Sequence, residues 1–402
     1  MSLRFGPTTL AIPGPSIVPE RVLRAMHRAS PNIYEGELVD IMDELTADLK
    51  RVARTAHEVA IYIGNGHAAW EAALANVCSH GDKALVLVTG RFALGWADMA
   101  KAMGVDVELM DFGTAAPVDP QQVEDRLRAD TAGELKAVLT VHTDTSTSVK
   151  SDIPSMRKAL DAAGHDALLM VDCIACLGCD EFLMDAWGVD VMGAGCQKGL
   201  MTPAGVSFTF HGPKAAEAAK TAECRTSYWN WDPRTDPDLF YQRFAGTAPT
   251  HHLYGLREAL TMLLEEEGLE ACWARHQHFA ETLWAATDHW AEGQALACNI
   301  HDRAHRSIAV TTLRIEGCAA SEVRAWCEAA AGLTLGIGLG LDAAGTPPSD
   351  GIFRIGHMGH LSAHNFLGTI ATVDAALKAL EVPHGEGAVA AATMEIARRA
   401  AA

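Results

Sequence analysis

Two charged residues, Lys198 and Asp172, follow apolar segments of the chain and are the first candidates for chemistry. Lys198 lies in "GAGCQKGLMT", residues 193–202, directly after the apolar stretch "GVDVMGAG". Removing an ammonium from water is costly, so a lysine in these surroundings predicts an ionic partner or a covalent role. Asp172 lies in the apolar run "ALLMVDCI", and a carboxylate buried there needs a cation or several donors. A structural lysine–aspartate ion pair, or an aspartate that caps a helix, would explain the same residues without catalysis.

A glycine-rich turn between a predicted strand and a predicted helix could bind an anion. The segment "GNGHAAWEAAL" places Asn65, Gly66 and His67 directly before that helix. Free N–H groups at a helix N-terminus, with glycines that allow close approach, suit a phosphate. The segment is not a Walker A loop, because no GKS or GKT follows it. Further along, "HTDTSTS" supplies hydroxyl groups, including that of Thr145, although a turn or a helix cap would use the same residues.

These features together fit pyridoxal phosphate. That cofactor needs a lysine to form a Schiff base, an acid to keep its ring nitrogen protonated, and donors for its phosphate. Lys198, Asp172 and the turn at Asn65 supply one group for each of these needs. Lys198 can then be buried because it is covalently bound, and it becomes a proton carrier when substrate displaces it.

The elements that must position these residues alternate between short apolar strands and helix-length segments. Near-continuous apolar strands that alternate with helices indicate a mostly parallel sheet covered on both faces. Ligands of such sheets bind beyond the carboxyl ends of the strands, where the candidate residues stand. We therefore predict an α/β fold with a mostly parallel seven-stranded sheet. Its predicted strands cover residues 59–64, 83–90, 105–112, 136–143, 167–174, 189–195 and 205–210.

The chain is long enough for two domains of ordinary size, since a domain has roughly 100–200 residues. The last hundred residues mix strand-like runs such as "SIAVTTLRI" with helical patterns, which indicates a smaller α+β domain. A long helical stretch is expected from about residue 251 to residue 291. The predicted division is an N-terminal arm (1–20), a large cofactor-binding domain (21–275), a small C-terminal domain (276–382) and a tail (383–402).

Composition and charge exclude several classes of partner. The 402 residues carry a net charge of −19, which repels nucleic acid phosphates and anionic membrane surfaces. No apolar run is long enough for a membrane helix, and the first residues lack the apolar stretch of a secretory signal, so we expect a cytoplasmic protein. The ten cysteines are scattered through a long chain, which indicates free thiols rather than a framework of disulfide bonds. Cys173, Cys176 and Cys179 continue an apolar run, so we interpret them as small core residues and expect no metal site.

Several motifs resemble those of fold-type I pyridoxal-phosphate enzymes of the class V aminotransferase group, in particular the alanine–glyoxylate and serine–glyoxylate aminotransferases. The resemblance covers most of the chain. "GCQKGLMTPAGVSF" and "FRIGHMG" carry it most specifically. The other segments that share it are "PGPSIVPERVLRAM", "NGHAAWEAAL", "TGRFALGWADMA", "HTDTSTSVKSDI", "LLMVDCIACLG" and "LYGLREAL".

The resemblance implies a role for each matching residue. Lys198 would form the Schiff base, and Asp172 would pair with the pyridine nitrogen. Thr247 would reach the phosphate from the partner subunit, which implies a homodimer with its active site at the subunit interface. The remaining cofactor contacts would come from Asn65, Gly66, His67, Phe92, Thr145, Ile174 and Gln197, and the substrate contacts from Arg354, Pro13, Gly14 and Tyr34.

The implied activity is transamination between a small amino acid (serine, alanine or aspartate) and a small 2-oxoacid, with glyoxylate as the expected acceptor, by a ping-pong mechanism. The chain departs from the family pattern at Asp144, at Ala175–Cys176, at Phe244 and in "PNIYEGELVD", residues 31–40. The last of these contains Tyr34 and could change the choice of donor. The alternatives are a pyridoxamine–pyruvate type of transaminase and a lyase or desulfurase of the same fold.

Overall fold

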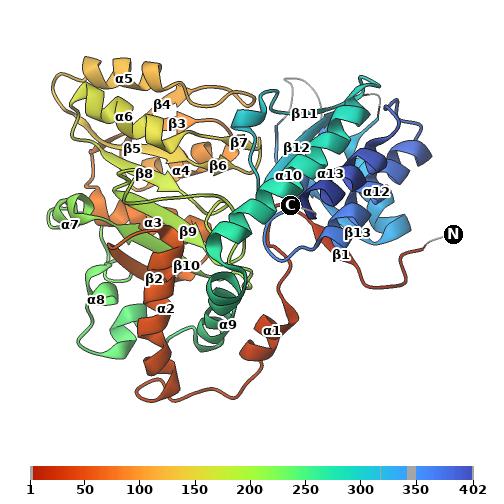
Figure 1. Ribbon diagram of the computed structural model, residues 1–402. Coiled ribbons are helices and arrows are strands. Elements are labelled where there is room, and N and C mark those ends of the chain that lie inside the picture. The colour runs from red at the N-terminus through yellow and green to blue at the C-terminus, as the bar shows by residue number, and fades with distance from the viewer. Residues whose placement is uncertain (1–2, 317, 342–349, 401–402) are drawn as a thin grey trace.

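The computed structural model describes residues 3–316, 318–341 and 350–400, arranged around two sheets (Figure 1). The larger sheet has seven strands in the order β2-β10-β9-β8-β5-β3-β4, and only β10 runs antiparallel to its neighbours. The predicted α/β fold with a mostly parallel seven-stranded sheet is therefore confirmed. The strands are β2 (Glu58–Gly64), β3 (Lys83–Val88), β4 (Asp106–Asp111), β5 (Leu135–Val141), β8 (Leu168–Asp172), β9 (Val191–Gly195) and β10 (Gly205–His211).

Helices cover both faces of this sheet because its strands are apolar on both faces. In β2, Val59 and Ile61 point into one buried core while Ala60 and Tyr62 point into the other. The core on the Val59 side includes α2 (Glu37–Ala53), α5 (Pro120–Ala129), α6 (Ile153–Ala163) and α9 (Thr250–Thr261). The core on the Ala60 side includes α3 (Gly66–Val77), α4 (Arg91–Ala102) and α7 (Pro213–Ala219).

The second sheet has the order β1-β13-β14-β12-β11 and a core of its own. Strand β1 comes from the start of the chain, and the C-terminal helix α13 contributes Ala388 and Ala392 to the same core. The first strand and the last helix of the described residues therefore both pack with this sheet. Its elements are β1 (Thr9–Ala11), β11 (Leu296–Cys298), β12 (Val310–Ile315), β13 (Leu333–Ile337), β14 (Ile352–Gly356), α10 (Leu269–Ala291), α11 (Ala320–Trp326), α12 (Ala363–Ala379) and α13 (Ala388–Ala400).

The helical stretch expected over residues 251–291 is interrupted. After α9 the chain makes a π-helical segment, Met262–Glu267, and α10 begins only after Gly268. Gly268 has a φ of 86°, which favours glycine and cannot continue a right-handed helix. The shorter elements of the chain are α1 (Glu20–Met26), β6 (Thr143–Asp144), β7 (Val149–Lys150) and α8 (Asp232–Thr235). In the described part of the chain no helix combines the length and apolarity that crossing a membrane requires.

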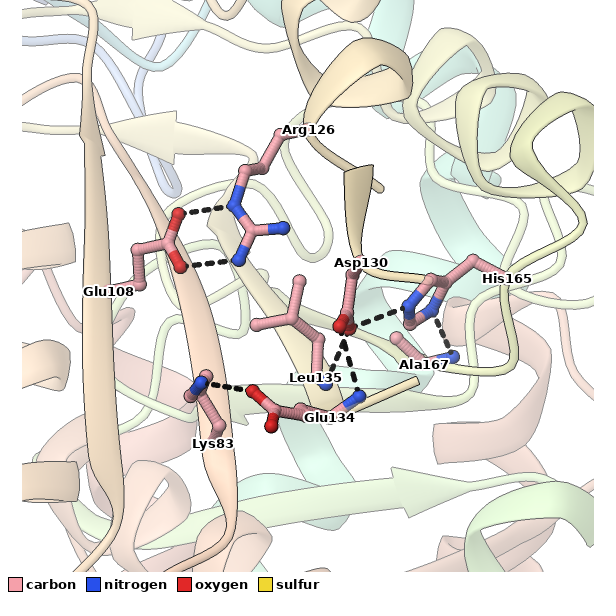
Figure 2. A network of polar contacts seen from close by, with 8 residues as sticks. All are labelled: Lys83, Glu108, Arg126, Asp130, Glu134, Leu135, His165 and Ala167. Atoms are coloured by element: carbon pink, nitrogen blue, oxygen red, sulfur yellow. Dashed lines mark hydrogen bonds and ion pairs between the residues drawn. The ribbon is translucent and has the colours of Figure 1, made fainter. Parts of the chain in front are cut away.

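A polar network joins the amino ends of the strands, at the edge opposite their carboxyl ends (Figure 2). Asp130, after α5, accepts hydrogen bonds from the N–H groups of Glu134 (3.1 Å) and Leu135 (2.8 Å) and lies 3.0 Å from His165 Nε2. Burial alone would raise the pKa of Asp130, but these bonds outweigh burial and lower the pKa to about 2. The turn that enters β5 is thus held by one ionised carboxylate.

Replacing this carboxylate should destabilise the protein at neutral pH. Asp130→Asn keeps the shape but removes a charged acceptor, and we expect a loss of about 1–3 kcal/mol in the free energy of unfolding. Because the folded pKa lies below the unfolded value, the contribution is present above about pH 4 and is lost as the pH falls towards 2. Urea unfolding of both proteins between pH 7 and pH 2 checks this.

The matched control is Glu134→Gln, which removes an exposed ion pair with Lys83 and should cost less than about 1 kcal/mol. A stability difference between wild type and Asp130→Asn that stays constant as the pH falls would contradict the assignment.

Candidate active site

A cavity of about 240 Å³ lies at the carboxyl ends of the large sheet. The structure brings most of the predicted site residues together there. Those that line the cavity are Gly14, Asn65, Gly66, His67, Phe92, Thr145, Asp172, Ile174, Gln197 and Lys198.

Lys198 enters the cavity from the turn after β9, and the N-terminal segment holds that turn. The Ser16 hydroxyl donates to the Lys198 carbonyl (2.7 Å), and the Ser16 N–H donates to the Gln197 carbonyl (2.9 Å). The Lys198 ammonium donates to the carbonyl of Pro13. A Cβ on Gly14 would overlap the Lys198 side chain, so this position must be glycine for the lysine to lie here. Removal from water lowers the pKa of Lys198 to about 8, with Arg354 acting in the same direction and Asp172 against it.

Asp172 is the last residue of β8, and its side chain is buried at the wall of the cavity. One oxygen accepts from the N–H of Ile174 (2.7 Å), and the other accepts from the indole N–H of Trp70 (3.0 Å). Burial raises the pKa of Asp172 to about 7 despite these bonds. No cationic side chain within the described ranges forms an ion pair with it. The carboxylate is therefore held in place by donors but is not neutralised.

The glycine-rich turn forms the end of the cavity beside α3. Asn65 caps the helix by accepting from the N–H of His67 (3.1 Å). A Cβ on Gly66 would overlap Ile174 Cδ1, so glycine allows the helix start and the wall to approach. The amide oxygen of Gln197 is buried and has no hydrogen-bond partner. This end thus offers helix N–H groups to an anionic ligand.

A buried acid, Asp144, positions two further wall residues. One of its oxygens accepts from the N–H of Phe92 (3.0 Å), and the other accepts from the N–H (2.9 Å) and hydroxyl (2.5 Å) of Ser146. The loop that carries Thr145 is thereby tied to the first turn of α4. Burial raises the pKa of Asp144, and these bonds oppose the rise. A Cβ on Gly90 would overlap the carboxylate, so the close approach depends on glycine.

Arg354, in β14, joins the two sheets and is not part of the cavity lining. Its Nε donates to the Ile337 carbonyl (2.5 Å), and its Nη1 donates to the Thr145 carbonyl (2.8 Å). Burial lowers the pKa of Arg354 to about 10, against the effect of Asp144, so the guanidinium stays charged at neutral pH. Its contacts are to backbone carbonyls, which leaves its charge without an ion pair among the described residues.

Two predicted site residues lie apart from the cavity of a single chain. Tyr34 is 75% exposed, and its N–H donates to the side chain of Asn32. Thr247 is also exposed. Pro13 does not line the cavity, but its carbonyl bonds Lys198.

Trp70 is the main contributor that the sequence prediction missed. Besides its bond to Asp172, its ring lies 4.6 Å from the ring of His67 and meets Phe92 edge-on at 6.2 Å. Trp70 stands four residues after Gly66 in α3, a spacing that places both on one face of the helix. That spacing was the available signal. Thr143, Pro15, Ala175 and Ala204 complete the lining.

Comparison with known proteins assigns the chain to a family. Residues 12–339 match the family Aminotransferase class-V, and the chain belongs to this family. It is 36% identical to serine–glyoxylate aminotransferase of Methylorubrum extorquens over 97% of this chain and 96% of that protein. It is 34% identical to L-aspartate–glyoxylate aminotransferase of Paracoccus denitrificans, with 97% and 96% covered.

Among solved structures, pyridoxamine–pyruvate aminotransferase from Mesorhizobium loti superposes with a TM-score of 0.87 at 22% identity, covering 99% of this chain and 100% of that one. At this identity the likeness shows the fold. The protein is an aminotransferase, and the resemblance drawn from its motifs is confirmed.

The bond between Trp70 and Asp172 can be tested by a pair of variants. Trp70→Phe keeps an aromatic ring but leaves the buried carboxylate with one donor fewer. Trp96→Phe is the matched control, because Trp96 stacks on Trp70 and its indole N–H has no hydrogen-bond partner. In urea unfolding of the cofactor-free protein we expect Trp70→Phe to lose about 1–3 kcal/mol more than Trp96→Phe. Equal losses in the two variants would show that the Trp70 bond contributes nothing.

Proposed function

We propose that this aminotransferase uses pyridoxal phosphate to transfer the amino group of serine, alanine or aspartate to a small 2-oxoacid, with glyoxylate as the acceptor best supported. The observation that carries the proposal is that Asp172 and Lys198, on adjacent strand ends, line one small cavity. The activities named for the relatives in Methylorubrum and Paracoccus support glyoxylate as acceptor.

The residues present fit the cofactor. The un-neutralised carboxylate of Asp172 suits a protonated pyridine nitrogen, and the free N–H groups at the start of α3, in the same cavity, suit a phosphate. The side chains of Phe92 and Ile174 line the cavity and would contact the ring faces. When bound, pyridoxal phosphate supplies an electron sink for the charge left at the substrate Cα when its proton is removed.

The chain's own groups would bind the substrate and move its proton. Lys198 Nζ would hold the cofactor covalently and would move the proton of the substrate Cα. Its pKa of about 8 suits both tasks near neutral pH. Asp172 would supply the negative charge that keeps the ring nitrogen protonated. Arg354, which lies behind the Thr145 loop, would supply the positive charge for the substrate carboxylate, and the small cavity would limit the substrate side chain.

The two alternatives have less support. A desulfurase needs a nucleophilic cysteine at the reacting centre, and none of the described cysteines lines the cavity. Pyridoxamine–pyruvate transamination has only the fold likeness behind it.

We also propose a cytoplasmic homodimer whose subunits complete each other's sites. Tyr34 and Thr247 lie outside the cavity of one chain, so their predicted roles require a second copy. Large exposed apolar side chains, including Ile63 (42%), Leu239 (54%) and Tyr241 (42%), support such an interface. All ten cysteines have free thiols, which is usual in a reducing compartment.

Mixing the cofactor-loaded protein with single amino acids tests the proposed half-reaction. We expect serine, alanine or aspartate to change the visible absorption of the bound cofactor, and glyoxylate to restore it. Lys198→Ala should lower turnover by several orders of magnitude, because no other described cavity residue carries a side-chain amine.

Borohydride reduction of the loaded wild type, followed by peptide mass analysis, should find the cofactor attached at Lys198. Attachment at another lysine, or undiminished turnover in Lys198→Ala, would overturn the proposal.

A further inference from the structure

A second cavity, of about 610 Å³, lies between the large sheet, helix α10 and the segment that precedes β12. It shares no lining residue with the candidate active site. Its wall includes His142 from the end of β5, Glu181 and Trp187 from the loop after β8, and Trp273 from α10. The proposed aminotransferase chemistry uses none of these residues.

The charges around this cavity are unequal. Three carboxylates line it, those of Asp152, Asp180 and Glu181, against one lysine, Lys150, and two histidines, His142 and His305. Lys150 is already bound to Asp180 (2.9 Å), and Asp152 caps helix α6 through the N–H of Ser155 (3.2 Å). The Glu181 carboxylate has no ion pair or hydrogen bond with any residue in the described ranges. The cavity therefore presents one uncommitted negative charge.

Two tryptophan rings stand on the same wall. Trp187 is half-buried, and its ring stacks on His142 with 6.2 Å between centroids and 17° between planes. Trp273 already accepts one cation, because the Arg54 guanidinium lies 5.5 Å from the centre of its ring. Aromatic faces beside a carboxylate attract an ammonium whose other groups are apolar.

Further polar atoms of the wall lack partners. The Ser151 hydroxyl is buried, with the residue 1% exposed, and makes no hydrogen bond; the indole N–H of Trp273 is likewise unpaired. Buried polar atoms without partners are rare, and at a cavity they indicate a missing ligand or water. A metal ion fits poorly, because the described residues contain no group of three or more His, Cys, Asp or Glu side chains that could hold one.

We propose that this second cavity binds a small organic ammonium ion, held by the Glu181 carboxylate and the face of Trp187.

His142 lies between the second cavity and the candidate active site. Its Nδ1 lies 3.2 Å from the hydroxyl of Thr143, which lines the first cavity. Its backbone N–H donates to the carbonyl of Asp172 (3.0 Å). A ligand against the His142 wall is thus one residue away from both groups.

Choline is a suitable probe, because its quaternary nitrogen has no proton and can neither bond the cofactor aldehyde nor be transaminated. Calorimetric titration of the cofactor-loaded protein should show saturable binding of one choline per chain, at constant ionic strength set with sodium chloride. We expect Glu181→Gln and Trp187→Leu each to weaken binding roughly threefold to tenfold. Glu217→Gln, which makes the same change at an exposed ion pair of α7, should bind choline as wild type does.

Glu181 is exposed, so its amide variant is expected to fold even if Trp187→Leu disturbs the contacts of Trp187 with Phe182 and His142. The absence of saturable binding, or an unchanged affinity in Glu181→Gln, would overturn the proposal. Neither result bears on the proposed transamination, which uses the other cavity and a primary amine.

Discussion

A buried carboxylate that is bonded but not neutralised, Asp172, is the constraint on which the rest of the structure depends. Asp172 ends strand β8, and the neighbouring strand β9 leads into the turn that carries Lys198. The two side chains line one cavity without forming an ion pair. Burial raises the pKa of Asp172 to about 7 and lowers the pKa of Lys198 to about 8, so the charged form of each group is less favoured than it is in water. Burying such groups costs free energy that the surrounding packing must offset. The arrangement makes chemical sense if a cation completes it, and the pyridinium of the proposed cofactor is such a cation.

The surroundings of the pair are built to hold it in place. The indole of Trp70, in α3, and the N–H of Ile174, just after β8, donate hydrogen bonds to the Asp172 carboxylate. Ser16, near the start of the chain, bonds the turn that carries Lys198. The chain start belongs to the second sheet, and Arg354 of that sheet bonds the Thr145 loop. The two sheets are thus joined at the cavity. A site supported on rigid elements from both sheets keeps its reacting groups at fixed positions.

Much of this could be predicted from sequence because it rests on local patterns. Apolar runs bounded by glycine located the strands, and residues at strand ends gave Lys198 and Asp172. The contribution of Trp70 was harder to predict, since a tryptophan in an apolar helix is ordinarily core. The break at Gly268 was missed because a single glycine between two helical patterns is compatible with one continuous helix. Arg354 was expected to bind the substrate carboxylate. Its hydrogen bond to the Thr145 carbonyl could not be predicted, because the two residues are far apart in the sequence and meet only in the folded chain. The predicted roles of Tyr34 and Thr247 involve a second subunit. The structure of a single chain does not test these roles, so they stay predictions.

A crystal structure of the protein grown with pyridoxal phosphate tests the central claim most directly. The account predicts electron density continuous from Lys198 Nζ into a flat ring in the first cavity, with the ring nitrogen facing Asp172 and the phosphate at the start of α3. A ring bound elsewhere, or one whose nitrogen points away from Asp172, would contradict it.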